Sequence, residues 1–387
     1  MKNASPSELR ALHDRAQRIA RSLEPQSRQA LQTGIEGILR RHRAVGASVV
    51  ICPPNAPAQL YHYGHARLNP KTPVTASTCF RIASVSKLVM SFAVLSLCES
   101  GKLNLDCDIS EYLGYCVRHP GGGAPITMRM LLTHTAGITD AGPYGTRGMQ
   151  PGCTLCELLA SPASWRNSLP GEAFHYSNLG AGAAGVVLER AADMPFDDIL
   201  QARVFQPLGI RASYDPRRIV PADDLADGYS VRGILPPRLR YDAARLAARP
   251  PEAFDPERDY LIAAGRMITD SRGMEQLIRL LASRDGMGVL CSDSLAMMRA
   301  PQDGMPGIKC AGRGLNTAFL PGVFSGFSPV GHQGVAYGMC AELFADPLTG
   351  AGVGVMTSGV RLARQAPLMR AGFDLLALGF AWLSKNN

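Results

Sequence analysis

The sequence is poor in long hydrophobic stretches. No run reaches the roughly 18 uninterrupted apolar residues that a membrane-spanning helix needs. The longest apolar segment near the end, AGFDLLALGFAWL, is short and carries Asp374. The first residues, MKNASPSELRALHD, contain neither the apolar core nor the small-residue cleavage site of a secretory signal. We therefore expect no membrane span and a cytoplasmic location.

The sequence also lacks a strong excess of charge of one sign. Forty basic and 32 acidic side chains give a net charge of +8, spread over 387 residues. The densest basic run, RRHR from Arg40 to Arg43, is typical of the solvated end of a helix. We therefore expect no nucleic-acid partner.

Metal-binding spacings are nearly absent. The ten cysteines are scattered through a long chain without a signal peptide, which favours reduced thiols. Cys153 and Cys156 have C-x-x-C spacing, but no second such pair or H-x-x-x-H accompanies them. Because a structural zinc site needs about four ligands, we interpret both as free cysteines and expect no metal and no cofactor.

The periodicity of apolar residues predicts two helices at the start of the chain and a series of helices in its middle. Strands are predicted before and after this middle part. The N-terminal helices are expected over 6–23 and 27–43, and an alternating pattern predicts a β-hairpin over 47–52 and 59–65. A further helix is expected from Ser84 to Gly101, and helical pieces with long loops fill 103–283. The expected later elements are strands in 307–320, 335–346 and 352–359 and a final helix over 364–384.

Strands at both ends of the chain predict an α+β fold. In this fold, one antiparallel sheet forms from both chain ends, helices flank it, and a mainly helical lobe is inserted. The expected divisions are an N-terminal helical extension, 1–27, and a domain, 28–387, in which an α/β lobe (28–83 and 285–387) encloses a helical lobe (84–284). A substrate pocket is expected where the two lobes meet.

Ser84 and Lys87 begin the predicted helix as Ser-Val-Ser-Lys. Three residues are about one helical turn, so both side chains project from the same face. A serine hydroxyl needs a neighbouring base to become a nucleophile, and a buried lysine can accept its proton. The helix N-terminus adds N–H groups that suit a developing oxyanion. The pattern is common by chance, so it gains weight only beside other motifs.

Two downstream segments can complete such a site. Tyr176-Ser177-Asn178 can present a phenol beside an amide, although a packed tyrosine and a helix-capping asparagine would give the same pattern. Gly331-His332-Gln333-Gly334 precedes an expected strand. There, glycine allows close backbone approach to a ligand, and a turn histidine is the alternative.

Taken together, these motifs resemble those of the β-lactamase-like serine hydrolases, a family that includes class C β-lactamases, D-alanyl-D-alanine carboxypeptidases, D-aminopeptidases and esterases. The resemblance covers about residues 30–360. It includes CFRIASVSK, MRMLLTHTAGI, LPGEAFHYSN, VFQPLGI, AAGRMITDSRGMEQL and GHQGVAYG. The resemblance implies the α+β fold predicted above.

The resemblance also implies a role for each motif residue. Ser84 would form an acyl-enzyme, while Lys87 and Tyr176 would share its proton. Asn178 would bind Lys87 or a substrate amide, and His332, Gln333 and Gly334 would line the substrate site. The backbone N–H groups of Ser84 and Val335 would form the oxyanion hole. His134 and Thr135, within LLTHTAGI, correspond to a structural turn.

The sequence departs from the family pattern at one motif that bears on the substrate. Lactamases and carboxypeptidases carry Lys-Thr-Gly as the third motif, and this chain has His332-Gln333-Gly334. Because histidine is a weaker cation and the hydroxyl is missing, we predict a hydrolase of an ester, amide or small peptide. A true β-lactamase or D-alanyl-D-alanine carboxypeptidase stays an alternative, as does a catalytically silent binding or scaffold protein. The expected partner is a small-molecule or peptide substrate, and the sequence does not decide the oligomeric state.

Overall fold

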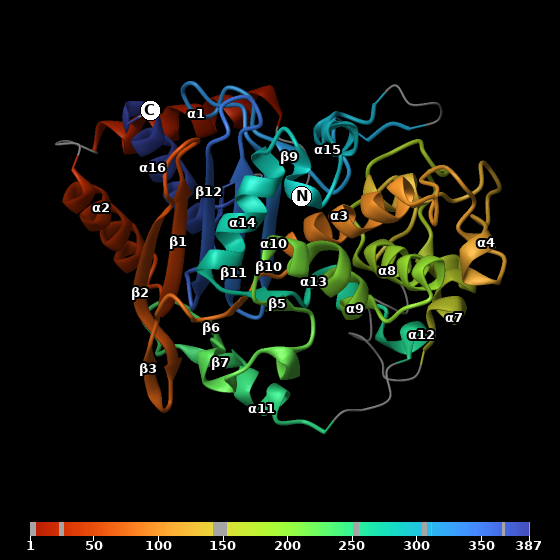
Figure 1. Ribbon diagram of the computed structural model, residues 1–387, viewed down its shortest axis with the longest axis horizontal. Coiled ribbons are helices and arrows are strands. Elements are labelled where there is room, and N and C mark those ends of the chain that lie inside the picture. Colours follow the sequence, from red (N-terminus) through yellow and green to blue (C-terminus); the bar gives the residue numbers. More distant parts are fainter. Residues whose placement is uncertain are drawn as a thin grey trace.

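A seven-stranded antiparallel sheet organises the protein (Figure 1). The computed structural model describes residues 5–22, 27–141, 153–250, 255–303, 308–310, 312–365 and 368–386. The strands run in the order β3-β2-β1-β12-β11-β10-β9. They are β1 (Gly46–Cys52), β2 (Gln59–Leu68), β3 (Lys71–Pro73), β9 (Ala318–Phe319), β10 (Val330–Ala336), β11 (Met339–Ala345) and β12 (Gly352–Ser358). The β1–β12 pairing joins the two chain ends, so the predicted α+β arrangement is confirmed.

Three terminal helices cover one face of this sheet (Figure 1). They are α1 (Pro6–Arg21), α2 (Arg28–Arg41) and α16 (Arg370–Asn386). Val49, Val353 and Phe344 point from the strands into a core shared with these helices. The N-terminal extension therefore packs on the sheet domain, with Leu12 and Ala16 of α1 buried in this core.

The opposite face is covered by α14 (Ser271–Ala282) and α3 (Val85–Glu99), which belong to the larger core. Gly354 of β12 leaves room for α14, because a Cβ there would stand 2.5 Å from the side chain of Met274. Although α14 lies in the range expected for the helical lobe, it packs on the sheet. The sheet-packed part of the chain thus begins before residue 285.

The remaining helices form the inserted lobe and its connections (Figure 1). They are α4 (Ser110–Leu113), α5 (Met128–Leu132), α7 (Leu155–Ala160), α8 (Asn178–Ala192), α9 (Phe196–Leu200), α10 (Gln206–Leu208), α11 (Ala243–Ala247), α12 (Pro256–Asp259), α13 (Ile262–Gly265), α15 (Ser292–Arg299), the π-helix η2 (Gln201–Phe205) and the 3-10 turns η1 (Pro162–Ser164), η3 (Pro216–Arg218), η4 (Ala222–Asp224) and η5 (Gly286–Gly288).

Three small sheets complete the fold. They are formed by β4 (Phe80–Arg81), β5 (Ala212–Ser213) and β8 (Ile268–Thr269), by β6 (Gly228–Ser230) and β7 (Arg238–Tyr241), and by β13 (Arg364–Gln365) and β14 (Leu368–Met369). Among the residues that the structure describes, no helix is long and apolar enough to cross a membrane.

Several element boundaries differ from the sequence prediction. The strand expected over 335–346 is interrupted at Tyr337 and Gly338, whose positive φ angles of 52° and 83° turn β10 into β11. Only Ala318–Phe319 of the strand expected in 307–320 pairs with the sheet. The last helix begins at Arg370 because β13 and β14 occupy the preceding residues.

Candidate active site

Ser84 stands where the chain enters α3, directly after an unusual backbone conformation. Ala83 has a φ of 48°, in the left-handed region that residues with a side chain rarely adopt. Ser84 occupies the N-cap position of α3, yet its side chain makes no capping hydrogen bond. A serine at this position ordinarily caps the helix. Here the hydroxyl is instead available to the cavity beside it and to Lys87.

Lys87 is fully buried and lies beside Ser84. Its side chain is 0% exposed, and its Nζ donates to Ser84 Oγ at 3.2 Å and to Asn178 Oδ1 at 2.8 Å. A third, short hydrogen bond goes to the carbonyl oxygen of Ala264 in α13. These three acceptors surround Nζ, so its position is fixed from three sides.

Tyr176 lies on the other side of Lys87, in the loop before α8. The Lys87 Nζ is 5.1 Å from the centroid of the Tyr176 ring. The ring of His134 packs against the same tyrosine, with centroids 4.4 Å apart. The backbone of His134 accepts from His175 N at 2.7 Å, and its Nδ1 accepts from Ser177 N at 3.3 Å. His134 therefore supports the loop that presents the phenol.

Asn178 is held in place by Asp140, a residue that the motif analysis did not select. Asp140 Oδ2 accepts from Asn178 Nδ2 at 2.9 Å, while Oδ1 accepts from the backbone N–H of Asn178 at 2.8 Å and of Leu179 at 3.1 Å. The amide is thereby oriented with Oδ1 toward Lys87. The cap of α8 is Ser177, whose Oγ accepts from Gly180 N. Asn178 is thus not the helix cap.

The third motif lies on β10, beside the start of α3. Gly334 is required there, because a Cβ would stand 2.1 Å from the carbonyl oxygen of Ile82 and 2.8 Å from the backbone nitrogen of Ser84. His332, two residues earlier, shares the face of Gly334 since side chains alternate along a strand. The His332 ring centroid is 6.3 Å from that of Tyr176, and Val335 lines the same cavity as Ser84.

Gln333 does not join this group. Its Nε2 donates to Oε1 of Glu342 on the neighbouring strand. Glu342 faces α16, because a Cβ on Gly372 of that helix would stand 2.2 Å from Glu342 Oε1. The Gln333 side chain therefore points to the helix-covered face of the sheet, away from Ser84. The expectation that it lines the substrate site disregarded the two-residue alternation of a strand.

Burial sets the charges around Tyr176. It lowers the pKa of His134 and of His332 well below the ordinary range, and the charge of Lys87 adds to this effect. Both rings are neutral at pH 7, and His332 Nδ1 lies 2.6 Å from the Gln333 carbonyl oxygen. Burial lowers the pKa of Arg313 to about 10, so this side chain remains charged. Arg313 lies 4.7 Å from the centroid of Phe174, two residues before Tyr176.

A cavity of about 1070 Å³ opens beside Ser84. Tyr176, Asn178 and Val335 line it together with residues of α13, β7 and η3. Cys153 and Cys156 do not line it, and both are free thiols at the start of α7. The sequence predicts that substrate choice depends on the segment around Pro143 and Tyr144, and this segment lies outside the described residues.

Comparison with solved structures identifies the fold. The D-amino acid amidase from Ochrobactrum anthropi SV3, complexed with L-phenylalanine amide, superposes with a TM-score of 0.70. The match covers 92% of this chain and 99% of the amidase at 22% sequence identity. It therefore supports the fold of β-lactamases and penicillin-binding proteins, and at this identity it supports the fold alone.

Sequence comparison identifies the family. A model of the Beta-lactamase family matches residues 26–375, and the chain belongs to this family. Esterase EstB from Burkholderia gladioli is 32% identical over 243 residues, which cover 56% of this chain and 61% of the esterase. The Beta-lactamase of Providencia stuartii is 27% identical over 191 residues, 49% of this chain and 47% of that protein. The matched part of the chain thus spans less than two thirds of either relative.

Proposed function

We propose that the protein is a serine hydrolase that forms an acyl-enzyme through Ser84. The observation that carries this proposal is the contact between Lys87 Nζ and Ser84 Oγ at 3.2 Å, with the lysine fully buried and the serine not used as a helix cap. Family membership supports hydrolysis in general. The nucleophile and its partners are inferred from this contact and from the residues around it.

In the proposed reaction, Ser84 Oγ forms a bond to the substrate carbonyl carbon as its proton passes to the Lys87–Tyr176 pair. Tyr176 then delivers that proton to the leaving alcohol or amine as the scissile bond breaks. In the second step, water attacks the acyl carbon and gives one proton to Tyr176. This proton passes to Ser84 Oγ as the bond between Oγ and the acyl carbon breaks, which releases the acid and restores Ser84. Asn178 holds Lys87 and can also contact a substrate amide.

The oxyanion that develops on the carbonyl oxygen needs donors in a fixed position. We assign this role to the backbone N–H groups of Ser84 and Val335. The close approach of Gly334 to Ser84 supports this assignment, since it brings the β10 edge to the start of α3. Such donors are typically worth about 3 kcal/mol of transition-state stabilisation.

The proposed substrates are esters, amides or small peptides, with β-lactams less favoured. His332 stands where lactamases carry lysine, and its burial keeps it neutral, so it offers no cation to a substrate carboxylate. The test is a panel of a 4-nitrophenyl ester, a D-amino acid amide and nitrocefin, assayed on wild type and Ser84→Ala.

We expect ester or amide turnover that Ser84→Ala abolishes, and little nitrocefin turnover. Rapid, saturable nitrocefin hydrolysis would restore the β-lactamase alternative. Equal turnover by wild type and Ser84→Ala would contradict Ser84 as the nucleophile. No turnover by either protein on the whole panel would favour a binding or scaffold protein.

A further inference from the structure

The cavity beside Ser84 has an excess of positive charge on its described lining. Seven arginines and four aspartates line it, a net charge of +3. Its volume of about 1070 Å³ exceeds what a short acyl group fills. The arrangement of these arginines therefore bears on the substrate.

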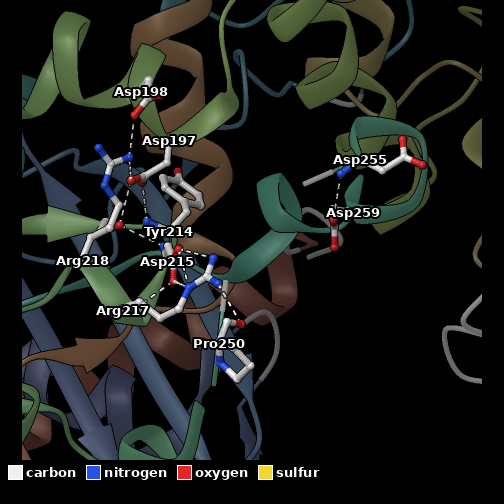
Figure 2. Close-up of polar contacts among 10 residues, drawn as sticks. Asp197, Asp198, Tyr214, Asp215, Arg217, Arg218, Pro250, Asp255 and Asp259 are labelled. Carbon is white, nitrogen blue, oxygen red and sulfur yellow. Dashed lines mark hydrogen bonds and ion pairs between the residues drawn. The ribbon is translucent and has the colours of Figure 1, made fainter. Parts of the chain in front are cut away.

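Two of the arginines are neutralised by neighbouring aspartates, as Figure 2 shows. Arg217 Nη2 lies 2.6 Å from Asp215 Oδ2. Arg218 Nη1 lies 2.7 Å from Asp197 Oδ2 and 2.6 Å from Asp198 Oδ1 (Figure 2). The Arg218 pairs join the η3 turn to α9, and the Arg217 pair lies within η3 and its N-cap. They leave the positive excess to the other arginines of the cavity.

Arg81, Arg240, Arg245 and Arg266 form no ion pair with any carboxylate in the part of the chain that the structure describes. The two remaining aspartates of the lining accept backbone hydrogen bonds instead. Asp242 accepts from the backbone N–H of Arg245 at 2.9 Å, as the cap of α11. Asp259 accepts from the backbone N–H of Asp255 at 3.2 Å (Figure 2).

Arg81 is held rigidly on the wall that carries the nucleophile. Its Nε donates to the carbonyl oxygen of Gly265 at 2.7 Å, and Gly265 follows the residue that holds Lys87. The guanidinium carbon lies 4.8 Å from the ring centroid of Tyr337 and 5.4 Å from that of Tyr241. A guanidinium fixed by stacking loses little entropy when it binds an anion, and its planar fork matches a carboxylate or phosphate.

We propose that the substrate carries an anionic group, a carboxylate or phosphate, in addition to the bond that Ser84 attacks. Arg81 and Arg266 bind this group, and Arg240 strengthens the field in the outer cavity. This inference rests on the proposed function, because it describes the substrate of the same site. It concerns Arg81 on β4, Arg266 at the C-terminal end of α13 and Arg240 on β7. The third motif on β10 carries only a neutral histidine.

The test compares esters that differ only in charge. On the acyl side these are 4-nitrophenyl hydrogen suberate and its methyl ester. On the leaving-group side they are 4-acetoxybenzoate and its methyl ester, with 4-acetoxyphenyl phosphate as the phosphate probe. We expect kcat/KM to favour the anionic member of at least one pair by about 10-fold at low salt, and this preference to shrink as salt is added.

The variants Arg266→Gln and Arg240→Gln test whether these two arginines contribute to binding the anionic group. Each is expected to lower the anionic-to-neutral ratio of kcat/KM about 3-fold. Arg238→Gln is the matched control, because Arg238 lies two residues from Arg240 on β7 and does not line the cavity. This control should leave the ratio unchanged. Equal kcat/KM for charged and neutral members of both pairs, or a preference that survives both variants, overturns the inference.

The two proposals fail in distinguishable ways. If Ser84 turns over the neutral esters without preferring the anionic ones, the anion site is wrong and the hydrolase proposal stands. If no ester is turned over, calorimetry with suberate on Ser84→Ala still measures the anion site. Binding that Arg266→Gln weakens would support the site, and absence of binding would contradict it.

Discussion

The carboxylate of Asp140 orients the side chain of Asn178. Asp140 Oδ2 accepts from Asn178 Nδ2 at 2.9 Å, and Asn178 Oδ1 in turn accepts from Lys87 Nζ at 2.8 Å. Because an amide has one oxygen and one NH2 group, fixing the NH2 group toward Asp140 directs the oxygen toward Lys87. Asp140 is therefore a positioning residue for the proposed proton-handling pair, and it does not touch Ser84 itself.

Asp140→Asn is expected to lower kcat about 10- to 100-fold while KM changes little, because Lys87 would lose its fixed position. The variant would combine with Asn178→Ala non-additively, since both act on the same hydrogen-bond chain. The control is Asp193→Asn at the other end of α8, which removes the same charge. Normal kcat for Asp140→Asn in a stably folded protein would contradict this role.

Gly334→Ala tests the contact between β10 and the start of α3. The added methyl group would stand 2.1 Å from the Ile82 carbonyl oxygen, a backbone atom that cannot rotate away. We expect kcat/KM to fall at least about 100-fold, because Ser84 and the proposed oxyanion hole would separate. Gly37→Ala in α2, where a Cβ has no neighbour within 4 Å, is the control and should retain full activity.

Arg15 anchors the N-terminal helix to the last helix. Its Nε and Nη2 donate to Asp374 at 2.6 and 2.7 Å, and His42 Nε2 lies 3.0 Å from the same carboxylate. We expect Arg15→Ala to lower the free energy of unfolding by about 2 kcal/mol, because it leaves a buried carboxylate with one partner fewer. Denaturant unfolding measures this, with the exposed Arg18→Ala of α1 as control.

The carboxylate of Asp374 makes the free energy of unfolding depend on pH in the acid range. Burial alone would raise the pKa of Asp374, but the hydrogen bonds from His42 and Arg15 outweigh burial and lower it. A lowered pKa means that the stabilisation is present above the usual carboxyl pKa of about 3.9 and is lost as the pH falls below it. Asp374→Asn should flatten the acid side of the stability profile; an unchanged slope would contradict this assignment.

Glu342 affects the pH dependence of stability in the opposite direction to Asp374. Burial raises the pKa of this carboxyl well above its ordinary value, even though Gln333 and Cys340 hydrogen-bond to it. The folded state then holds a proton that the unfolded state releases, so stability falls as pH rises above about 4.3. Glu342→Gln should remove this loss and raise the melting temperature at pH 8 relative to pH 5, without changing activity. An identical pH profile for wild type and variant would show that Glu342 does not titrate in this way.

The sequence predicted the fold well where local patterns and long-range pairing agree. Alternation predicted the β1–β2 hairpin. The strand at 352–359 pairs with β1 in the single antiparallel sheet that was expected from both chain ends, although this particular pairing was not predicted. The sequence analysis did not select Asp140 as a site residue, because it belongs to none of the motifs and lies 38 residues before Asn178 in the chain. The Gln333 side chain could have been placed correctly from the strand period alone. The role of Ala264 could not be predicted, because a backbone carbonyl leaves no trace in the residue type.

The most direct measurement of the central claim is the site of covalent acylation. A fluorophosphonate or a rapidly quenched 4-nitrophenyl ester is allowed to react, and the tryptic peptide Ile82–Lys87 is sequenced by tandem mass spectrometry. The account predicts one adduct, on Ser84 and not on Ser86, that is absent from Ser84→Ala. An adduct on another residue, or labelling that persists in Ser84→Ala, would contradict it.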